Sequence, residues 1–358
     1  MASVPELLDA LLRAAGPSGH ETAPAKVWRD SVAAFSDDVR ADRVGSSVVR
    51  VPRAGTQDSP AGPSLAVIGH IDEIGVHVTH IEDSGLLRFG EVGGWDPIQL
   101  VGQRIVLTTR DGELRGVIGR KPIHLIRGED RDKAPKIKDL HIDVGAANGD
   151  EARTIVRVGD VGVIDSEPLR LRNDRLVSRS LDNRIGSYVA AETARLVAEA
   201  GGAPGDVFGL AVAQEETTFA GARTSAFGLH PDVAVVVDVT HATDQPGVEL
   251  GPDTSHELGS GPVIARSTSV HPAVTELLLA TAESEGIAHT VESVGRQTGT
   301  DADAVHASRT GVPTAVVSIP LRYMHSSVEL VALPDVEATA RLLAAFARRL
   351  GPELVLER

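Results

Sequence analysis

Two adjacent carboxylates follow an apolar segment at Gly209–Glu216, which reads Gly-Leu-Ala-Val-Ala-Gln-Glu-Glu. An apolar run of this length, entered through the loop Gly201–Gly205, predicts a buried strand of a parallel sheet. Open α/β sheets bind their ligands beyond the carboxyl ends of the strands. Neighbouring residues of an extended chain point to opposite sides, so one of Glu215 and Glu216 could bind a metal ion while the other accepts a proton. Taken alone, such a pair is more often a solvated strand end, because charged side chains are mostly exposed.

Four further candidate ligands stand at the ends of other predicted segments. They are two imidazoles and two carboxylates: His70, Asp182, Asp238 and His325. Nitrogen and oxygen ligands of these types suit zinc, cobalt or manganese. With one glutamate they exceed the needs of a single tetrahedral zinc ion, and they suit two ions that share a bridging carboxylate. Two such ions would activate one water and polarise a scissile carbonyl, while a protein base carries the proton. The alternatives are structural: hydrogen-bonded or surface histidines, a loop aspartate, and a helix N-cap at Asp182.

The segments around these residues alternate as in an α/β fold, which predicts a central mixed, mostly parallel sheet flanked by helices. Helices are predicted at Val4–Ala15, Ala23–Phe35, Ser187–Glu199, Thr217–Gly228, Ser269–Glu285, Ala302–Ser308 and Asp335–Arg349. Strands are predicted at Asp38–Val51, Ser64–Gly69, Val233–Val237, His289–Val294 and Thr314–Ile319, besides the strand before Glu215.

The pattern changes between Val76 and Asp165. Short alternating segments such as Arg104–Thr109 and Leu114–Ile118 are separated there by glycine-containing turns, which predicts a small β-barrel or sandwich. We therefore expect residues 1–75 and 166–358 to form the α/β catalytic domain, with residues 76–165 inserted into it. Within the insert, Lys121–Lys138 is charged, contains proline and has no periodicity, which predicts a mobile loop.

Composition excludes several other functions. The chain has 358 residues, 42% of them hydrophobic, with a formal net charge of −15 and no cysteine. The acidic balance disfavours nucleic acid and anionic membranes as partners. The lack of cysteine removes disulfides, zinc–thiolate sites and cysteine nucleophiles, so any metal must be bound by His, Asp and Glu. Neither a secretion signal nor an apolar run of the roughly 20 residues that span a bilayer is recognisable, so we expect a soluble cytoplasmic protein.

Seven short motifs occur in an order that resembles one known family. They are Gly69–Gly75, Gly116–Pro122, Asp139–Ala146, Ser180–Arg184, Gln214–Glu216, Asp238–Thr240 and Arg322–Ser326. Each motif is weak alone, but seven in this order are not expected by chance. Over nearly its whole length the chain resembles the tetrahedral aminopeptidases, metallopeptidase family M42 of the di-zinc exopeptidase clan. The resemblance implies the di-zinc exopeptidase fold with an inserted small β-barrel or PDZ-like domain.

The resemblance implies that five of the candidate residues bind metal. Asp182 would bridge two ions, His70 and Asp238 would bind one of them, and Glu216 and His325 would bind the other. The implied cofactors are two divalent ions per subunit, zinc or cobalt.

Other roles follow from the same resemblance. Glu215 would be the general base. Asp72 would orient the first histidine ligand, a role also expected on physical grounds because such an imidazole usually donates its other N–H to an oxygen. Apart from the resemblance, the segment Gly299–Asp301 could line the substrate pocket through Thr300 and Asp301 or only cap a short helix, and Arg322 is a third candidate for substrate binding.

The implied function is removal of N-terminal residues from short peptides, and an acidic site wall would favour an amine over a carboxylate. An N-acyl-amino-acid deacylase with the same ligands and a non-catalytic metal-binding scaffold stay open as alternatives. A glycosidase would need two carboxylates and usually no metal. The side-chain preference is also open, because a glutamyl preference would require a basic residue such as Arg296, Arg322 or Lys121 in the pocket.

The resemblance further implies dimers that assemble into tetrahedral dodecamers, with the inserted β-domain at the contacts. One segment departs from the family: Thr217–Ala222 replaces the usual Val-Gly turn after the two glutamates. Since glycine is lost there, we expect an altered turn beside the base.

Overall fold

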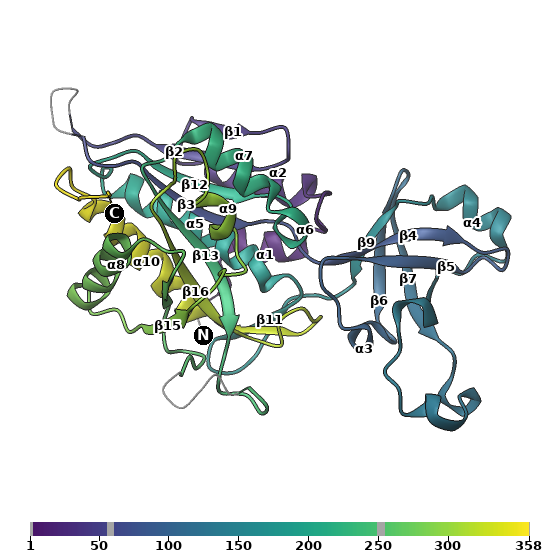
Figure 1. The fold of residues 1–358 in the computed structure, drawn as a ribbon. Helices are drawn as coiled ribbons and strands as arrows, with labels where there is room; N and C mark the ends of the chain where they lie inside the picture. Colours follow the sequence, from purple (N-terminus) through teal and green to yellow (C-terminus); the bar gives the residue numbers. More distant parts are fainter. Residues whose placement is uncertain (1–2, 56–60, 249–254, 358) are drawn as a thin grey trace.

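A computed structural model shows an α/β body from which a small β-barrel projects at one end (Figure 1). It describes residues 3–55, 61–248 and 255–357. The predicted fold class, an α/β fold with an inserted β-barrel, is confirmed.

The body is built on one mixed sheet of 11 strands in the described part of the chain. Its centre consists of four mutually parallel strands, β12 (Val207–Val212), β3 (Leu65–His70), β13 (Val233–His241) and β16 (Thr314–Arg322), in that order. The outer strands are β1 (Val39–Ala41), β2 (Ser47–Val51), β17 (Glu329–Ala332), β11 (Arg175–Ser178), β10 (Leu169–Arg170), β14 (Val263–Ser267) and β15 (Thr290–Val294). Since β3 and β12 are buried along their whole length, they read as continuous apolar runs.

Helices cover both faces of this sheet. One layer contains α1 (Glu6–Arg13), α2 (Thr22–Val32), α5 (Leu181–Glu199), α8 (Pro272–Ser284) and α10 (Leu333–Arg349); the other contains α7 (Ala220–Leu229) and α9 (Ala302–Val305). Alternate residues of β3 reach the two cores: Leu65 and Val67 pack in the first, Ala66 and Ile68 in the second. No helix in the described residues is long and apolar enough to cross a membrane.

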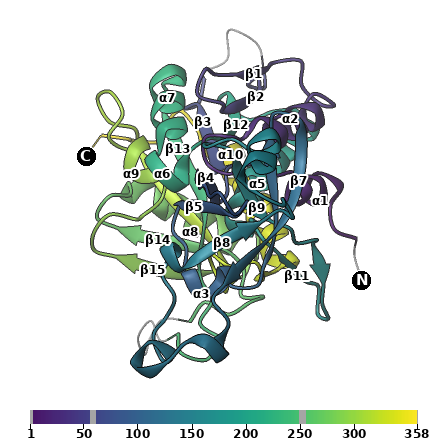
Figure 2. The ribbon, with the colours of Figure 1, turned by 90° about the vertical axis from the view of Figure 1, so that its right-hand side faces the viewer.

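The barrel, which lies in front of the α/β body in Figure 2, is a closed antiparallel structure. It has its own apolar core. Its strands are β4 (Gly75–Ile81), β5 (Leu87–Val92), β6 (Arg104–Thr109), β7 (Gly112–Arg120), β8 (Leu140–Asp143) and β9 (Val161–Ile164), accompanied by α3 (Pro97–Leu100) and α4 (Gly149–Ile155). The predicted loop at residues 121–138 contains two short 3-10 turns, η1 (Ile123–Leu125) and η2 (Gly128–Arg131), and a third, η3 (Ile137–Asp139), begins at its end.

Three predicted elements differ from the structure. The strand expected at Asp38–Val51 is a hairpin, because the Asp42 carboxylate accepts three successive backbone N–H groups and closes a turn. The helix expected at Thr217–Gly228 is divided into α6 (Glu215–Thr218) and α7 at Phe219, whose φ of +55° interrupts the helix. Helix α5 begins at Leu181 rather than Ser187, with non-helical backbone at Asp182 and Asn183.

A buried ion-pair network fixes the chain just beyond β3. Glu73 contacts the guanidinium groups of Arg179 and Arg184, each at 3.1 Å, and accepts the Gly16 backbone N–H at 3.0 Å. All three charged side chains are buried. Because buried charges are costly unless paired, this network holds the end of β3, the residues after α1 and the start of α5 in one arrangement.

Candidate metal centre

Close backbone packing brings the start of α5 to the carboxyl end of β3. A Cβ on Gly69 would lie 2.2 Å from the Gly186 carbonyl carbon, so only glycine allows this approach. Ser187 Oγ donates a hydrogen bond to the His70 carbonyl at 2.8 Å, and Asn183 Nδ2 donates to the Val237 carbonyl at 2.8 Å. The start of α5 is therefore attached to both β3 and β13. This places Asp182, the acidic residue in the first turn of α5, between the ends of the two strands.

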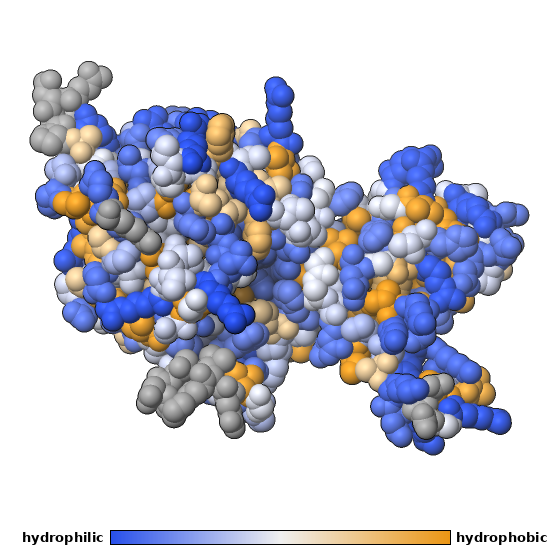
Figure 3. Space-filling model, in the orientation of Figure 1, coloured by the Kyte–Doolittle hydropathy of each residue, from blue (hydrophilic) through white to orange (hydrophobic). Residues whose placement is uncertain are grey.

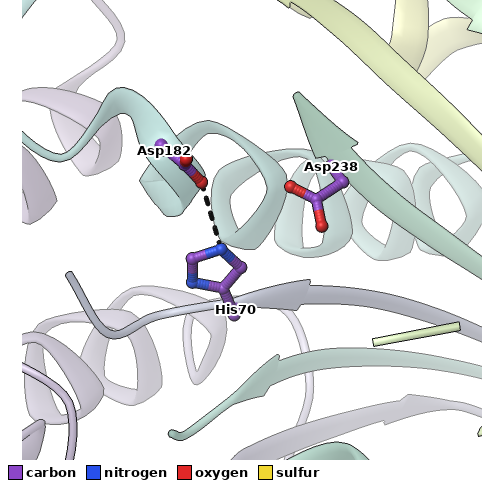
Figure 4. Close-up of side chains that lie close together, drawn as sticks. All are labelled: His70, Asp182 and Asp238. Atoms are coloured by element: carbon purple, nitrogen blue, oxygen red, sulfur yellow. Dashed lines mark hydrogen bonds and ion pairs between the residues drawn. The ribbon is translucent and has the colours of Figure 1, made fainter. Parts of the chain in front are cut away.

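The Asp182 carboxylate lies between two imidazoles. Its Oδ1 is 3.1 Å from His70 Nε2, as Figure 4 shows, and its Oδ2 is 3.5 Å from His325 Nε2. His325 Nε2 is also 3.5 Å from Glu216 Oε2. The ligand atoms of His70, Asp182 and Asp238 lie within 4.8 Å of one another, and so do those of Asp182, Glu216 and His325. The structure thus brings the five predicted ligands together in two groups that share one carboxylate.

In each imidazole, Nε2 faces the candidate carboxylate ligands and Nδ1 points away from them. His325 Nδ1 donates a hydrogen bond to the Gly94 carbonyl at 2.7 Å, and because a carbonyl only accepts, the proton is on Nδ1. His70 Nδ1 lies 3.4 Å from Asp72 Oδ1, which is the neighbouring position for an orienting carboxylate, although no hydrogen bond joins the two described groups in this structure. Gly94 follows β5, so a loop of the barrel orients a candidate ligand of the α/β body.

Both glutamates lie in the first turn of α6 rather than on an extended strand, and both line the same cavity. The predicted opposite orientation is therefore wrong. Buried Asp72 accepts the backbone N–H groups of Glu215 and Glu216 at 3.0 and 3.1 Å, while Glu21 accepts that of Gln214 at 3.1 Å. These tertiary bonds cap the short helix and hold its first turn. Glu215 Oε2 is 3.7 Å from His70 Nε2, which places the predicted base beside the ligands.

The cluster holds more negative charge than its imidazoles can neutralise. Burial raises the pKa of Glu215 to about 10 and that of Asp238 to about 7, against the attraction of His70. Burial also acts to raise the pKa of Asp182, but hydrogen bonds with the two histidines outweigh it and lower that pKa. Divalent cations would compensate this excess charge, so the donor set fits a metal centre.

The predicted substrate residues occupy different environments. Thr300 lines the cavity. Asp301 is buried, and neither of its carboxylate oxygens has a hydrogen-bond partner among the described residues. Arg322 pairs with Asp244 through both Nε and Nη2 and is not among the described residues that line the cavity.

Sequence reasoning missed Glu329, which supports two candidate ligands. Its Oε1 accepts the His325 backbone N–H at 2.9 Å, and its Oε2 accepts the Asp182 backbone N–H at 3.0 Å. The side chain is buried at the start of β17. A charged residue opening the apolar run Glu-Leu-Val-Ala four residues after His325 was the available signal, because such residues are rarely buried without a partner.

Replacing this glutamate tests its supporting role. In Glu329→Gln, one of the two backbone N–H groups would face an amide N–H₂ group instead of an oxygen. We expect metal affinity to fall about 10- to 100-fold, with activity recovering at high metal concentration. Metal titration of the purified variant measures this, with Glu337→Gln on the exposed side of α10 as control. Unchanged affinity in Glu329→Gln would contradict the role.

Comparison with known proteins agrees with this architecture. The family model of the M42 glutamyl aminopeptidases matches residues 53–342. A lysyl aminopeptidase of Pyrococcus furiosus is 35% identical over 351 residues, 97% of each chain. An aminopeptidase structure from Desulfurococcus kamchatkensis has a TM-score of 0.88 at 34% identity, covering 98% of this chain and 95% of that one. The TET1 peptidase of Pyrococcus horikoshii, which can assemble into a tetrahedron or a large octahedral shell, has a TM-score of 0.83 at 30% identity, covering 96% and 99%.

A shared fold over nearly the full length, with this imidazole and carboxylate cluster at the ends of the central strands, defines a hydrolase of the aminopeptidase class. The chain belongs to the M42 glutamyl aminopeptidase family, as the sequence motifs predicted.

Proposed function

We propose that this protein is a metal-dependent aminopeptidase that removes N-terminal residues from short peptides. The observation that supports this most strongly is the position of Asp182, with one carboxylate oxygen facing each of two imidazoles. In this proposal His70 and Asp238 bind one divalent ion, Glu216 and His325 bind the other, and the ions are zinc or cobalt. Bound there, the two ions would supply Lewis acidity for the scissile carbonyl and lower the pKa of a water.

The chain's own residues would position and move the proton. Glu215 would take a proton from the attacking water and return it to the leaving amine, as a general base and then a general acid. Bound cations would lower the pKa of Glu215, since positive charge favours its ionised form. Asp72 would hold both His70 and the turn that carries Glu215, so that the base and the ligand keep a fixed separation.

The acidic cavity also supports an aminopeptidase over a deacylase. Its described lining includes five carboxylates and no lysine or arginine. Two divalent ions would offset the charge of four carboxylates, which leaves Glu292 to attract a cationic group and no basic side chain to receive the carboxylate of an N-acyl amino acid.

Paired substrates test the proposal. With zinc or cobalt bound, the protein should hydrolyse an aminoacyl p-nitroanilide and leave its N-acetylated counterpart intact. Release of leucine from N-acetyl-leucine would favour the deacylase instead, and no turnover of either type would favour a non-catalytic scaffold. Both the p-nitroanilide assay and the N-acetyl-leucine assay are to be carried out on protein whose metal content has been measured.

We further propose that the barrel mediates self-association into dimers and a dodecamer. The barrel carries exposed hydrophobic side chains, which include Ile98, Val117, Ile123, Leu125 and Val158. Figure 3 shows hydrophobic surface among the hydrophilic surface of the barrel. Exposed apolar side chains that gather on one surface are typical of protein contact sites, so we expect the barrel to take part in the contacts. Sedimentation should show a species about twelve times the 37.5 kDa chain, and a monomer alone would contradict this proposal.

A further inference from the structure

The cavity at the metal centre extends beyond the candidate ligands. Its volume is about 360 Å³. Three small or branched apolar residues line the extension, Ala265 on β14, Val294 on β15 and Val316 on β16. Ala265 and Val316 are almost fully buried, so this wall belongs to the rigid sheet and not to a surface loop. A wall of this kind fits the methylene groups of a substrate side chain.

One carboxylate in this extension has no role in the proposed metal chemistry. Glu292 lies on β15 beside Ala265 of β14, two residues before Val294. Side chains two residues apart on a strand share a face, which is why both Glu292 and Val294 line the cavity. The other four carboxylates of the described lining are the proposed ligands and the proposed base, so Glu292 is available to substrate.

Among the described residues, Glu292 forms no ion pair with a lysine or arginine. Thr240 Oγ1 donates a long hydrogen bond of 3.4 Å to its Oε1. The neighbouring imidazole of His256 is buried, and burial lowers its pKa below the usual value, so that His256 is neutral at pH 7. No lysine or arginine is found in the described lining.

The basic residues that a glutamyl preference would require lie elsewhere. Arg322 is paired with Asp244. Arg296 lines a separate cavity beside His271 and His306. Lys121 lies in a basic cavity of the barrel. Among the described residues, this cavity therefore presents no lysine or arginine to an acidic N-terminal side chain, and it presents the Glu292 carboxylate to a basic one.

We propose that Glu292 selects peptides whose N-terminal residue is lysine or arginine. The inference rests on the proposed aminopeptidase function and names its substrate class. The methylene groups of the side chain would pack on Val294, Val316 and Ala265, and the terminal ammonium or guanidinium group would donate to Glu292. A charge-assisted hydrogen bond of this kind contributes more than a neutral one, so its loss is measurable in substrate preference.

The test compares lysyl and norleucyl p-nitroanilides, because norleucine has the same four-carbon side chain without the ammonium group. In wild-type protein, kcat/KM should favour the lysyl substrate. Glu292→Gln should lower kcat/KM for the lysyl substrate about 10- to 100-fold and change that for the norleucyl substrate less than about twofold. Glu292→Lys should shift the preference towards glutamyl p-nitroanilide. Glu283→Gln, an exposed change on α8, is the matched control and should alter neither ratio.

Two results would overturn the inference while leaving the aminopeptidase proposal intact: wild-type preference for norleucyl or glutamyl substrate, or an equal loss on all substrates in Glu292→Gln at unchanged metal content. Absence of turnover by metal-loaded wild-type protein on every free-amine substrate would instead overturn the aminopeptidase proposal, and this inference with it.

Discussion

Glu215→Gln is expected to lower kcat for aminoacyl-anilide hydrolysis about 10²- to 10⁴-fold, the usual contribution of a positioned general base. The amide keeps the size of the side chain but cannot accept a proton at neutral pH. The backbone bonds from Glu215 and Glu216 to Asp72 do not involve the changed group, so the turn and the other ligands should stay in place. KM and metal content should change little.

Metal analysis, thermal unfolding and steady-state kinetics on the same sample measure this. Glu113→Gln, at an exposed position of β7, is the control for a change of charge alone. Activity equal to wild type would show that Glu215 is not the base. A loss of activity accompanied by a loss of metal would show that Glu215 acts as a ligand instead.

Removing the metal is the second change with a large expected effect. A strong chelator should reduce hydrolysis to background and also lower the melting temperature. Without cations, the buried carboxylates of Asp182 and Asp238 and the half-buried carboxylate of Glu216 lie close together. Binding of a metal to the folded state alone stabilises it by about 4 kcal/mol at a free concentration of 1,000 Kd.

Adding zinc or cobalt back should restore both activity and melting temperature. Asp182→Asn is the matched variant, because it weakens the one carboxylate shared by both groups of ligands. Its melting temperature should respond to metal much less than that of the wild-type protein. Full activity in protein shown by elemental analysis to be free of metal would contradict the proposed mechanism.

Much of the fold was readable from local patterns. The buried strands β3 and β12 are continuous apolar runs, and the barrel strands are short alternating segments bounded by glycine turns. The spacing of apolar residues in each strand follows from whether one face of the strand or both faces are buried. Predictions failed where the backbone depends on a single tertiary or turn contact. One such feature is the break of a predicted helix at Phe219, and another is the hairpin turn closed by Asp42. The spacing of hydrophobic residues in the sequence indicates neither of them.

The candidate site, like the fold, was predictable from the sequence only in part. The residue types of the ligands, and their places next to apolar segments, were visible because catalytic groups of α/β sheets follow strand ends. The supporting groups were not: Glu329 acts through two backbone N–H groups, and Gly94 acts through a carbonyl that every residue possesses. Glu292 looked like any polar residue of an edge strand.

By itself, then, the amino-acid order determined which chemistry this protein can carry: oxygen and imidazole ligands without thiols, placed after buried strands, in motifs that mark the family. Only the tertiary structure decided how these groups meet, with one oxygen of Asp182 facing each imidazole and a loop of the barrel setting the tautomer of His325. The physical reason is that side-chain type and period are local properties of the chain, whereas ligand geometry, tautomer and the shape of the cavity depend on distances between residues far apart in the sequence.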